Sequence, residues 1–337
     1  MAALKVTRIA TVIGFRVGML ALACYSAVSL AAAPTVTAQQ FVDLQQGDSE
    51  FSGFRRAHAK GICIAGEFNA NGNLSKFSQS DLFAKGVSKF IGRFSIAGNN
   101  PYAPDLKAPV RSLALTFVSG AERFNIAMNT PPVMAVSNPH SFYQQLVAIK
   151  QGTEAVQTFF AEHPESADFL AWKRDYQPTP SLATETYHSI NAFYLVDEQG
   201  QRQAVRWQMA PLAKPQANHH DGADALQNEL AERLLQAPVE FAWQFTLAEP
   251  SDDENDPAKR WPSDRTKINA GTLTIERWQG QLEGPCHGMN FDPLVLPTGV
   301  TATADPILHA RSAAYAESYR RRAKEQLVNA VKESDDE

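Results

Sequence analysis

The sequence predicts an α+β protein that is mainly an antiparallel β-barrel, with helical insertions and a short C-terminal helix. Two observations lead to this fold class. Several segments alternate apolar and polar residues with a period of two, as in strands with one buried face. Other segments repeat apolar residues every three or four positions, the period of an amphipathic helix. Many strands in succession favour a barrel or a sandwich over a parallel sheet.

The expected strands are clearest in the segment 239–247, VEFAWQFTL, whose apolar side chains fall on alternate positions. Turn formers such as Ser119-Gly120 separate neighbouring strands. Shorter stretches with the same alternation predict strands at 113–118, 123–128, 191–197, 204–209 and 272–278.

The expected helices cover 80–91, 141–172, 224–236 and 306–331. The last one begins with Asp305-Pro306, because the aspartate can cap free N–H groups and the proline suits the first helical position.

Length and composition favour one large domain. The chain has 337 residues, of which 44% are hydrophobic, and this is enough to bury one core. We assign 39–332 to this domain and 333–337 to an acidic, solvated tail. A net charge of -5 leaves no excess of basic residues to neutralise a phosphate backbone, so nucleic acid is excluded as a partner.

Residues 1–38 have the build of an export signal. Lys5, Arg8 and Arg16 precede an apolar run, and small residues follow it. The alternative is an uncleaved membrane anchor, since the segment 9–33 could span a bilayer if Arg16 were tolerated. We expect a periplasmic or secreted protein with no stable membrane contact unless this segment is retained.

After cleavage the cysteines would be Cys63 and Cys286. An oxidising compartment would permit a bridge, but one pair so far apart in sequence has no geometric support. We therefore leave open whether Cys63 and Cys286 pair.

The C-terminal helix carries Arg311, Tyr315 and Arg322, which project from one face at about 100° per residue. A phenol binds ferric iron as phenolate when something favours its charged form, and a guanidinium four residues away does so. Tyrosinate ligation is the haem-binding mode of catalases. Taken alone, the pattern also fits an arginine packed on a surface tyrosine.

Two distant motifs resemble the catalase superfamily. The segment 311–322, RSAAYAESYRRR, is similar to the proximal haem-binding helix, and FDP at 291–293 resembles the segment that leads into it. The segment 54–61, FRRAHAKG, is similar to the active-site signature. The resemblance implies that Tyr315 is the proximal iron ligand beside Arg311 and that His58 is the distal acid/base.

Further blocks of the resemblance concern the haem's surroundings. GRFS at 92–95 resembles the block in which an arginine meets a propionate and a serine orients the histidine, which implies these roles for Arg93 and Ser95. Arg55 and Arg322 are implied as further propionate partners. Phe142 matches the phenylalanine that stacks on the haem.

One block departs from the family pattern. FNIAMNTP at 124–131 resembles the block that carries the distal asparagine, but alignment on Thr130-Pro131 places Met128 at that position and Asn129 beside it. A slip of one residue on a strand turns a side chain to the opposite face. We keep Asn129 as a candidate catalytic residue, although its side chain is expected on the face of the strand opposite to that of Met128.

The resemblance covers residues 40–325 and lacks the long tail of full-size catalases, as in the smaller catalase-related peroxidases. It implies a haem b protein that reduces hydrogen peroxide or an organic peroxide with a small organic electron donor. We expect this protein to be a homodimer. Two alternatives stay open: a true catalase, which the loss of asparagine at Met128 would weaken, and a haem carrier or sensor, against which His58 and Ser95 argue.

Overall fold

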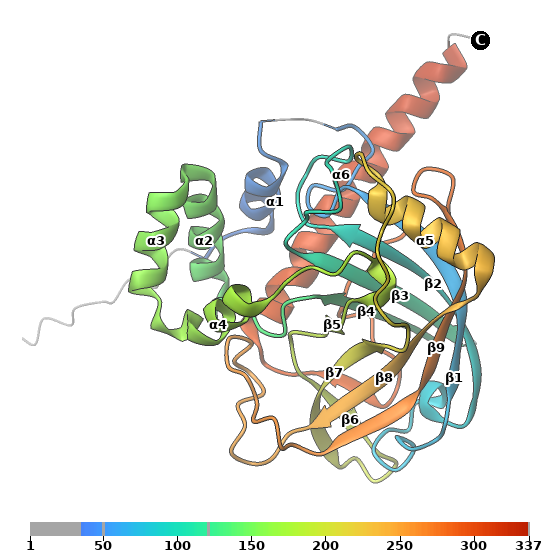
Figure 1. The fold of residues 1–337 in the computed structure, drawn as a ribbon. Coiled ribbons are helices and arrows are strands. Elements are labelled where there is room, and N and C mark those ends of the chain that lie inside the picture. Colours follow the sequence, from blue (N-terminus) through green and yellow to red (C-terminus); the bar gives the residue numbers. More distant parts are fainter. Residues whose placement is uncertain (1–34, 49–50, 120–121, 336–337) are drawn as a thin grey trace, which may run out of the picture. The chain divides into compact units, whose positions relative to one another are not determined.

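The computed structural model describes residues 35–48, 51–119 and 122–335 (Figure 1). Val36–Glu337 forms one compact unit. The expected export signal falls mostly on residues 1–34, outside the described part of the chain, so export and cleavage stay predictions. Within the described residues, no helix has the length and apolar character needed to cross a membrane.

An antiparallel sheet closes into a barrel at the centre of this unit. Among the described residues its strand order is β10-β6-β7-β5-β4-β3-β2-β1-β9-β8, and β8 also pairs with β7. This pairing closes a ring that runs from β7 to β8, with β6 and β10 as an extension. The expected fold class is confirmed. The strands are β1 (Gly61–Ala70), β2 (Gly86–Ile96), β3 (Arg111–Ser119), β4 (Glu122–Asn129), β5 (Tyr187–His188), β6 (Phe193–Val196), β7 (Arg202–Pro211), β8 (Val239–Leu247), β9 (Lys267–Gly280) and β10 (Val300–Ala302).

One expected helix is wrong. Within 80–91 only Asp81–Phe83 forms a single 3-10 turn, and β2 begins at Gly86. The apolar residues of this stretch fit either period, but β2 pairs with β1 on one side and β3 on the other. Tertiary pairing therefore outweighs the local pattern.

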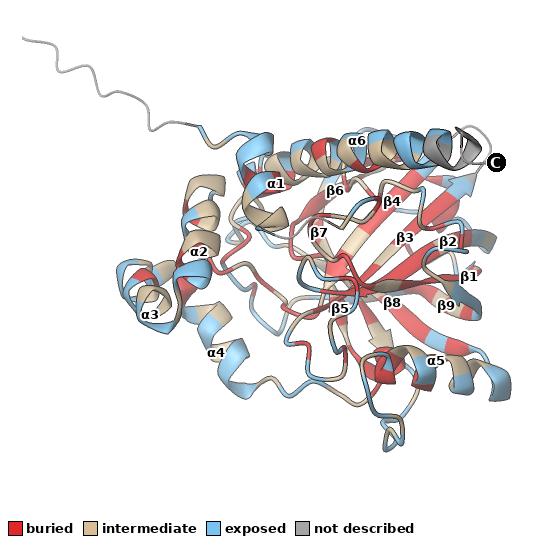
Figure 2. Cartoon of the chain, turned by 90° about the horizontal axis from the view of Figure 1, so that it is seen from above, coloured by how far each residue is buried: buried red, intermediate tan, exposed pale blue. Residues whose placement is uncertain are grey.

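The helices surround the barrel on several sides. Figure 2 shows α5 and α6 on opposite sides of the strands, with α2, α3 and α4 grouped beside them. The expected helix 141–172 is interrupted at Gly152, whose φ of 108° breaks the helical path, and again near Pro164. The helices are α1 (Ala38–Gln46), α2 (Pro139–Gln151), α3 (Thr153–Glu162), α4 (Ala167–Asp175), α5 (Ala225–Gln236) and α6 (Pro306–Asp335).

Aromatic side chains fill the barrel interior. Trp243 on β8 is fully buried, and its ring centroid lies 5.0 Å from that of Phe68 and 5.6 Å from that of Phe117. Such rings contribute more buried apolar area than other side chains. The alternation that predicts β8 from the sequence is thus the pattern that delivers these rings to the core.

Replacing Trp243 with alanine should lower the free energy of unfolding by about 3–5 kcal/mol, because it opens a cavity in this packing. Trp243→Phe should cost clearly less, since it keeps ring contacts and removes a buried indole N–H that has no hydrogen-bond partner among the described residues. Urea unfolding measures both variants. Equal losses would contradict the packing role.

Candidate active site

One large cavity lies between α6 and the ends of the strands β2, β3 and β4. Its volume is about 210 Å³, far above the roughly 10–15 Å³ that one water requires. It can therefore hold a large organic group. The nine residues singled out from the sequence all line it: Arg55, His58, Arg93, Ser95, Asn129, Phe142, Arg311, Tyr315 and Arg322.

Helix α6 forms one wall of the cavity. Its start is fixed by Asp305, whose buried carboxylate accepts hydrogen bonds from the N–H groups of Ile307 (2.8 Å) and Leu308 (3.2 Å). One turn further on, the guanidinium carbon of Arg311 lies 5.9 Å from the ring centroid of Tyr315. The structure thus places a cation over the phenol ring, as the helical spacing predicts.

A polar residue that the sequence analysis missed holds Arg311. The guanidinium donates to Asn191 Oδ1 and to the carbonyl of Ala127 (3.1 Å). Asn191 in turn donates from Nδ2 to Asp305 Oδ2 at 2.6 Å. The helix cap and the arginine are therefore linked through one buried amide. Asn191 lies in a segment that reads as a strand, and no local pattern marks it.

The opposite wall carries His58 and a row of polar side chains. Ser95, Ser112 and Asn129 are register partners on β2, β3 and β4, so they project from one face of the sheet. The Oγ of Ser112 lies 3.1 Å from His58 Nδ1 and donates to Asn129 Oδ1. The hydroxyl that contacts the histidine thus belongs to Ser112, one strand away from the expected Ser95, which lines the same cavity.

Met128 and Asn129 both line the cavity. Met128 is 1% exposed and also packs in the main hydrophobic core, whereas Asn129 accepts a hydrogen bond from Ser112. Asn129 therefore provides an amide on the histidine side, and the position that the alignment gives to Met128 stays an expectation.

The hydrogen bonds define which histidine nitrogen carries the proton. A hydroxyl has one proton, and Ser112 gives it to Asn129. Ser112 must then accept from His58 Nδ1–H, which leaves Nε2 as the unprotonated nitrogen. Burial, followed by the charges of Arg93, Arg311 and Arg55, lowers the pKa of His58 to about 4. The imidazole is thus a neutral base.

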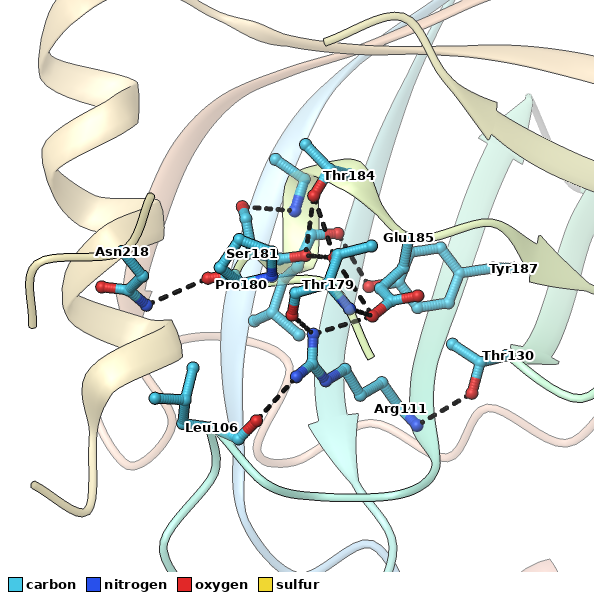
Figure 3. A network of polar contacts seen from close by, with 12 residues as sticks. Leu106, Arg111, Thr130, Thr179, Pro180, Ser181, Thr184, Glu185, Tyr187 and Asn218 are labelled. Carbon is cyan, nitrogen blue, oxygen red and sulfur yellow. Dashed lines mark hydrogen bonds and ion pairs between the residues drawn. The ribbon is translucent and has the colours of Figure 1, made fainter. Parts of the chain in front are cut away.

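A buried ion pair lies next to the strands that carry Ser112 and Asn129 (Figure 3). Arg111 is fully buried, and its Nη1 lies 2.8 Å from Glu185 Oε1. Its backbone N–H donates to Thr130 Oγ1 at 3.2 Å. Arg111 directly precedes Ser112, and Thr130 directly follows Asn129. The network therefore fixes the backbone on which the hydroxyl and the amide are mounted.

Three arginines gather at another part of the cavity. Arg55 Nη2 donates to the carbonyls of Cys286 (2.9 Å) and Met289 (2.8 Å), and Arg322 Nη2 donates to that of Met289 (2.9 Å). Arg93 Nε donates to the Gln281 side chain at 3.0 Å. In the described part of the chain these guanidiniums form no ion pair with a carboxylate, although several other arginines do.

The arginine cluster has spare hydrogen-bonding capacity. Arg322 Nε and Nη1 are buried without a partner among the described residues. Burial lowers the pKa of Arg93 to about 9, with the charge of Arg322 adding to the effect, and burial lowers the pKa of Arg322 to about 10. Burial likewise lowers the pKa of Arg55, with Arg93 and Arg322 adding to the effect. The cluster suits an anion that carries more than one carboxylate.

These features fit a haem. The phenol of Tyr315 and the imidazole of His58 reach one cavity from different walls, and unneutralised guanidiniums at the same cavity suit two propionates. Phe142 on α2 lines the cavity and stacks on Phe41, with centroids 5.9 Å apart. Within the described residues, no cluster of histidine, cysteine and carboxylate side chains offers a site for a bare metal ion.

Cys63 and Cys286, whose pairing the sequence leaves open, form a disulfide with Cα atoms 5.4 Å apart. Cys63 lies on β1, and Cys286 lies in the loop that follows β9, the strand that pairs with β1. The pairing of these strands brings the cysteines together, and sequence separation alone could not reveal it.

Comparisons with known proteins give matches over most of the chain. The family model described as Catalase matches residues 38–330. The chain is 36% identical over 310 residues to a catalase-related peroxidase of Synechococcus elongatus, covering 87% of this chain and 91% of that protein. A catalase-related peroxidase of Mycolicibacterium paratuberculosis is 28% identical, with 85% and 95% covered. Catalase-2 of Bacillus subtilis is 22% identical, and the match spans 43% of its length.

The stability of the cofactor-free protein should fall as the pH is lowered from 6.5 to about 4. Burial is the largest cause that lowers the pKa values of His58, His188 and His287 from 6.5 to about 4. Between pH 6.5 and about 4 the unfolded chain therefore binds protons that the folded protein does not bind. The contribution of these histidines to the free energy of unfolding is present above pH 6.5 and is lost on acidification. Urea unfolding at a series of pH values measures the slope, which His58→Gln should reduce. An unchanged slope would contradict the shifted His58 pKa.

Proposed function

The chain belongs to the catalase family, and on this premise we propose that it is a haem peroxidase that reduces hydrogen peroxide or an organic peroxide with electrons from a small organic donor. The observation that carries the proposal is the cavity shared by His58, Tyr315 and the arginine cluster. The two relatives matched over nearly their whole length are named catalase-related peroxidases, which supports peroxidase action over catalase action.

Haem b is the cofactor proposed for this cavity. Tyr315 would ligate the iron, with the guanidinium of Arg311 beside its ring. Arg55, Arg93 and Arg322 would bind the propionates, and Phe142 would stack on the ring. When bound, haem supplies an iron centre that takes up the oxidising equivalents of peroxide and passes them to the donor.

His58 would handle the proton during peroxide reduction. Its Nε2 is the free base, so it can accept a proton from one peroxide oxygen and return it to the other, which departs as water. Ser112 holds Nδ1–H, and Asn129 fixes the direction of the Ser112 hydroxyl. The low pKa of His58 keeps the imidazole ready as a base across the neutral range.

A true catalase is the second candidate. Its support is Asn129, because an amide on the histidine side could help to hold a second peroxide. A haem carrier or sensor would need no ordered histidine, serine and asparagine, so these contacts argue against it.

Export to the periplasm or outside the cell is proposed on two grounds. Residues 1–38 have the pattern of an export signal. The buried Cys63–Cys286 bridge adds support, since disulfides persist in oxidising compartments. Fractionation of cells that express the full chain tests the location. A homodimer is proposed as well, and sedimentation of the purified protein tests it.

The haem-loaded protein should show the charge-transfer bands of a high-spin ferric haem with a tyrosinate ligand. Tyr315→Phe removes only the phenol oxygen and should abolish or radically change these bands. Absorption and electron paramagnetic resonance spectra of both proteins provide the measurement, and Tyr319→Phe on the same helix is the control. An unchanged spectrum in Tyr315→Phe would show that another residue ligates the iron.

Loss of the acid/base group should slow peroxide-driven oxidation by about 100-fold or more in His58→Gln while haem is retained. Ser112→Ala should lower the rate as well, because it frees the imidazole, and Ser95→Ala should have the smaller effect. Donor oxidation and oxygen evolution are followed in parallel. Fast oxygen evolution without donor in the parent would favour catalase as the function. An active His58→Gln variant would exclude the acid/base role of His58.

A further inference from the structure

The loop after β9, residues 281–290, contacts all three residues of the arginine cluster, Arg55, Arg93 and Arg322. Two of its carbonyls, those of Cys286 and Met289, accept from Arg55, and the Met289 carbonyl also accepts from Arg322. At its start, the Gln281 side chain accepts from Arg93. The arginines come from three different parts of the chain, so this loop is the common element that sets their positions.

The loop has little regular structure of its own. Its backbone forms only short turns, with the N–H of Gly284 bonded to the carbonyl of Gly280 (2.9 Å) and that of His287 to the carbonyl of Gly284 (3.2 Å). Such a segment loses much conformational entropy when it is ordered. This entropy cost favours movement of the loop away from the barrel. The guanidiniums of Arg55, Arg93 and Arg322 also repel one another, so they depend on the loop's hydrogen-bond acceptors to stay together.

The Cys63–Cys286 disulfide opposes this movement. It joins the loop to β1, which lies between β2 and β9 in the closed sheet. Both cysteines are buried, and they pack with Phe291 in a small cluster that Tyr315 also contacts. The fit is tight, because a Cβ added at Gly284 would lie 2.5 Å from Cys63 Sγ.

We propose that Cys63 and Cys286 are positioning residues for the cofactor: their disulfide clamps the loop 281–290, and the loop presents Arg55, Arg93 and Arg322 to the haem carboxylates before haem arrives. The inference rests on the proposed haem function. The disulfide orders the loop before haem binds, so the free energy of haem binding is not reduced by the cost of ordering the loop. Oxidation of the cysteine pair thereby becomes a condition for tight haem retention.

The test compares the parent with Cys63→Val/Cys286→Ala, a pair that keeps apolar volume but lacks the covalent link. Leu230→Ala, in the buried face of α5, is the matched control for general loss of stability. Haem transfer to excess apomyoglobin gives the rate of haem loss. Hydrogen exchange of residues 281–290 in the haem-free proteins reports on the loop without reference to activity.

We expect the cysteine variant to lose haem about 10-fold to 100-fold faster than the parent and to exchange the loop amides faster, whereas Leu230→Ala shows neither change. Haem loss and loop exchange equal to those of the parent would overturn the proposal, as would equal effects in Leu230→Ala. If the cysteine variant does not fold, Gly284→Ala takes its place, because it displaces the loop with both cysteines present. A parent that binds no haem would contradict the proposed function, while loop exchange would still test the clamp.

Discussion

The site depends on positive charge that the protein does not neutralise itself. Arg93 and Arg322 are buried and Arg55 is half-buried at one cavity, and their hydrogen bonds within the described residues go to backbone carbonyls and an amide. Burying a cation costs free energy unless dipoles or an anion compensate for it. Carbonyl groups provide part of this compensation, and a ligand with carboxylates would provide the rest. Affinity for such a ligand is therefore built into the energetics of the fold.

The barrel and the C-terminal helix each position different groups of the site. The sheet aligns Ser112 and Asn129 in register, so the histidine partner is set by strand pairing rather than by a flexible loop. Helix α6 presents the phenol, and its cap at Asp305 is linked through Asn191 to Arg311. Each wall thus has contacts of its own that position its groups, which suits a site where groups act from different walls.

The sequence predicts best where function is encoded in short segments. His58 and Tyr315 lie in local motifs, and the structure brings both to one cavity. Contacts that depend on pairing between distant strands were harder to predict. The choice of Ser112 over Ser95 depends on the positions of three strands, and the cysteine bridge depends on the pairing of β1 with β9. The stretch 80–91 failed for the same reason, because its neighbours in the sheet decide its conformation.

Backbone conformation at the cavity has an evolutionary consequence. Among the described residues, the non-glycine positions with positive φ are His58 (53°) and Ile190 (64°), and both line the cavity. Such conformations typically cost about 1–3 kcal/mol each. Glycine would relieve the strain at position 58 but would remove the imidazole. Selection for thermal stability and selection for catalytic activity therefore favour different residues at position 58. Stabilising substitutions that preserve activity are expected at other positions of the chain.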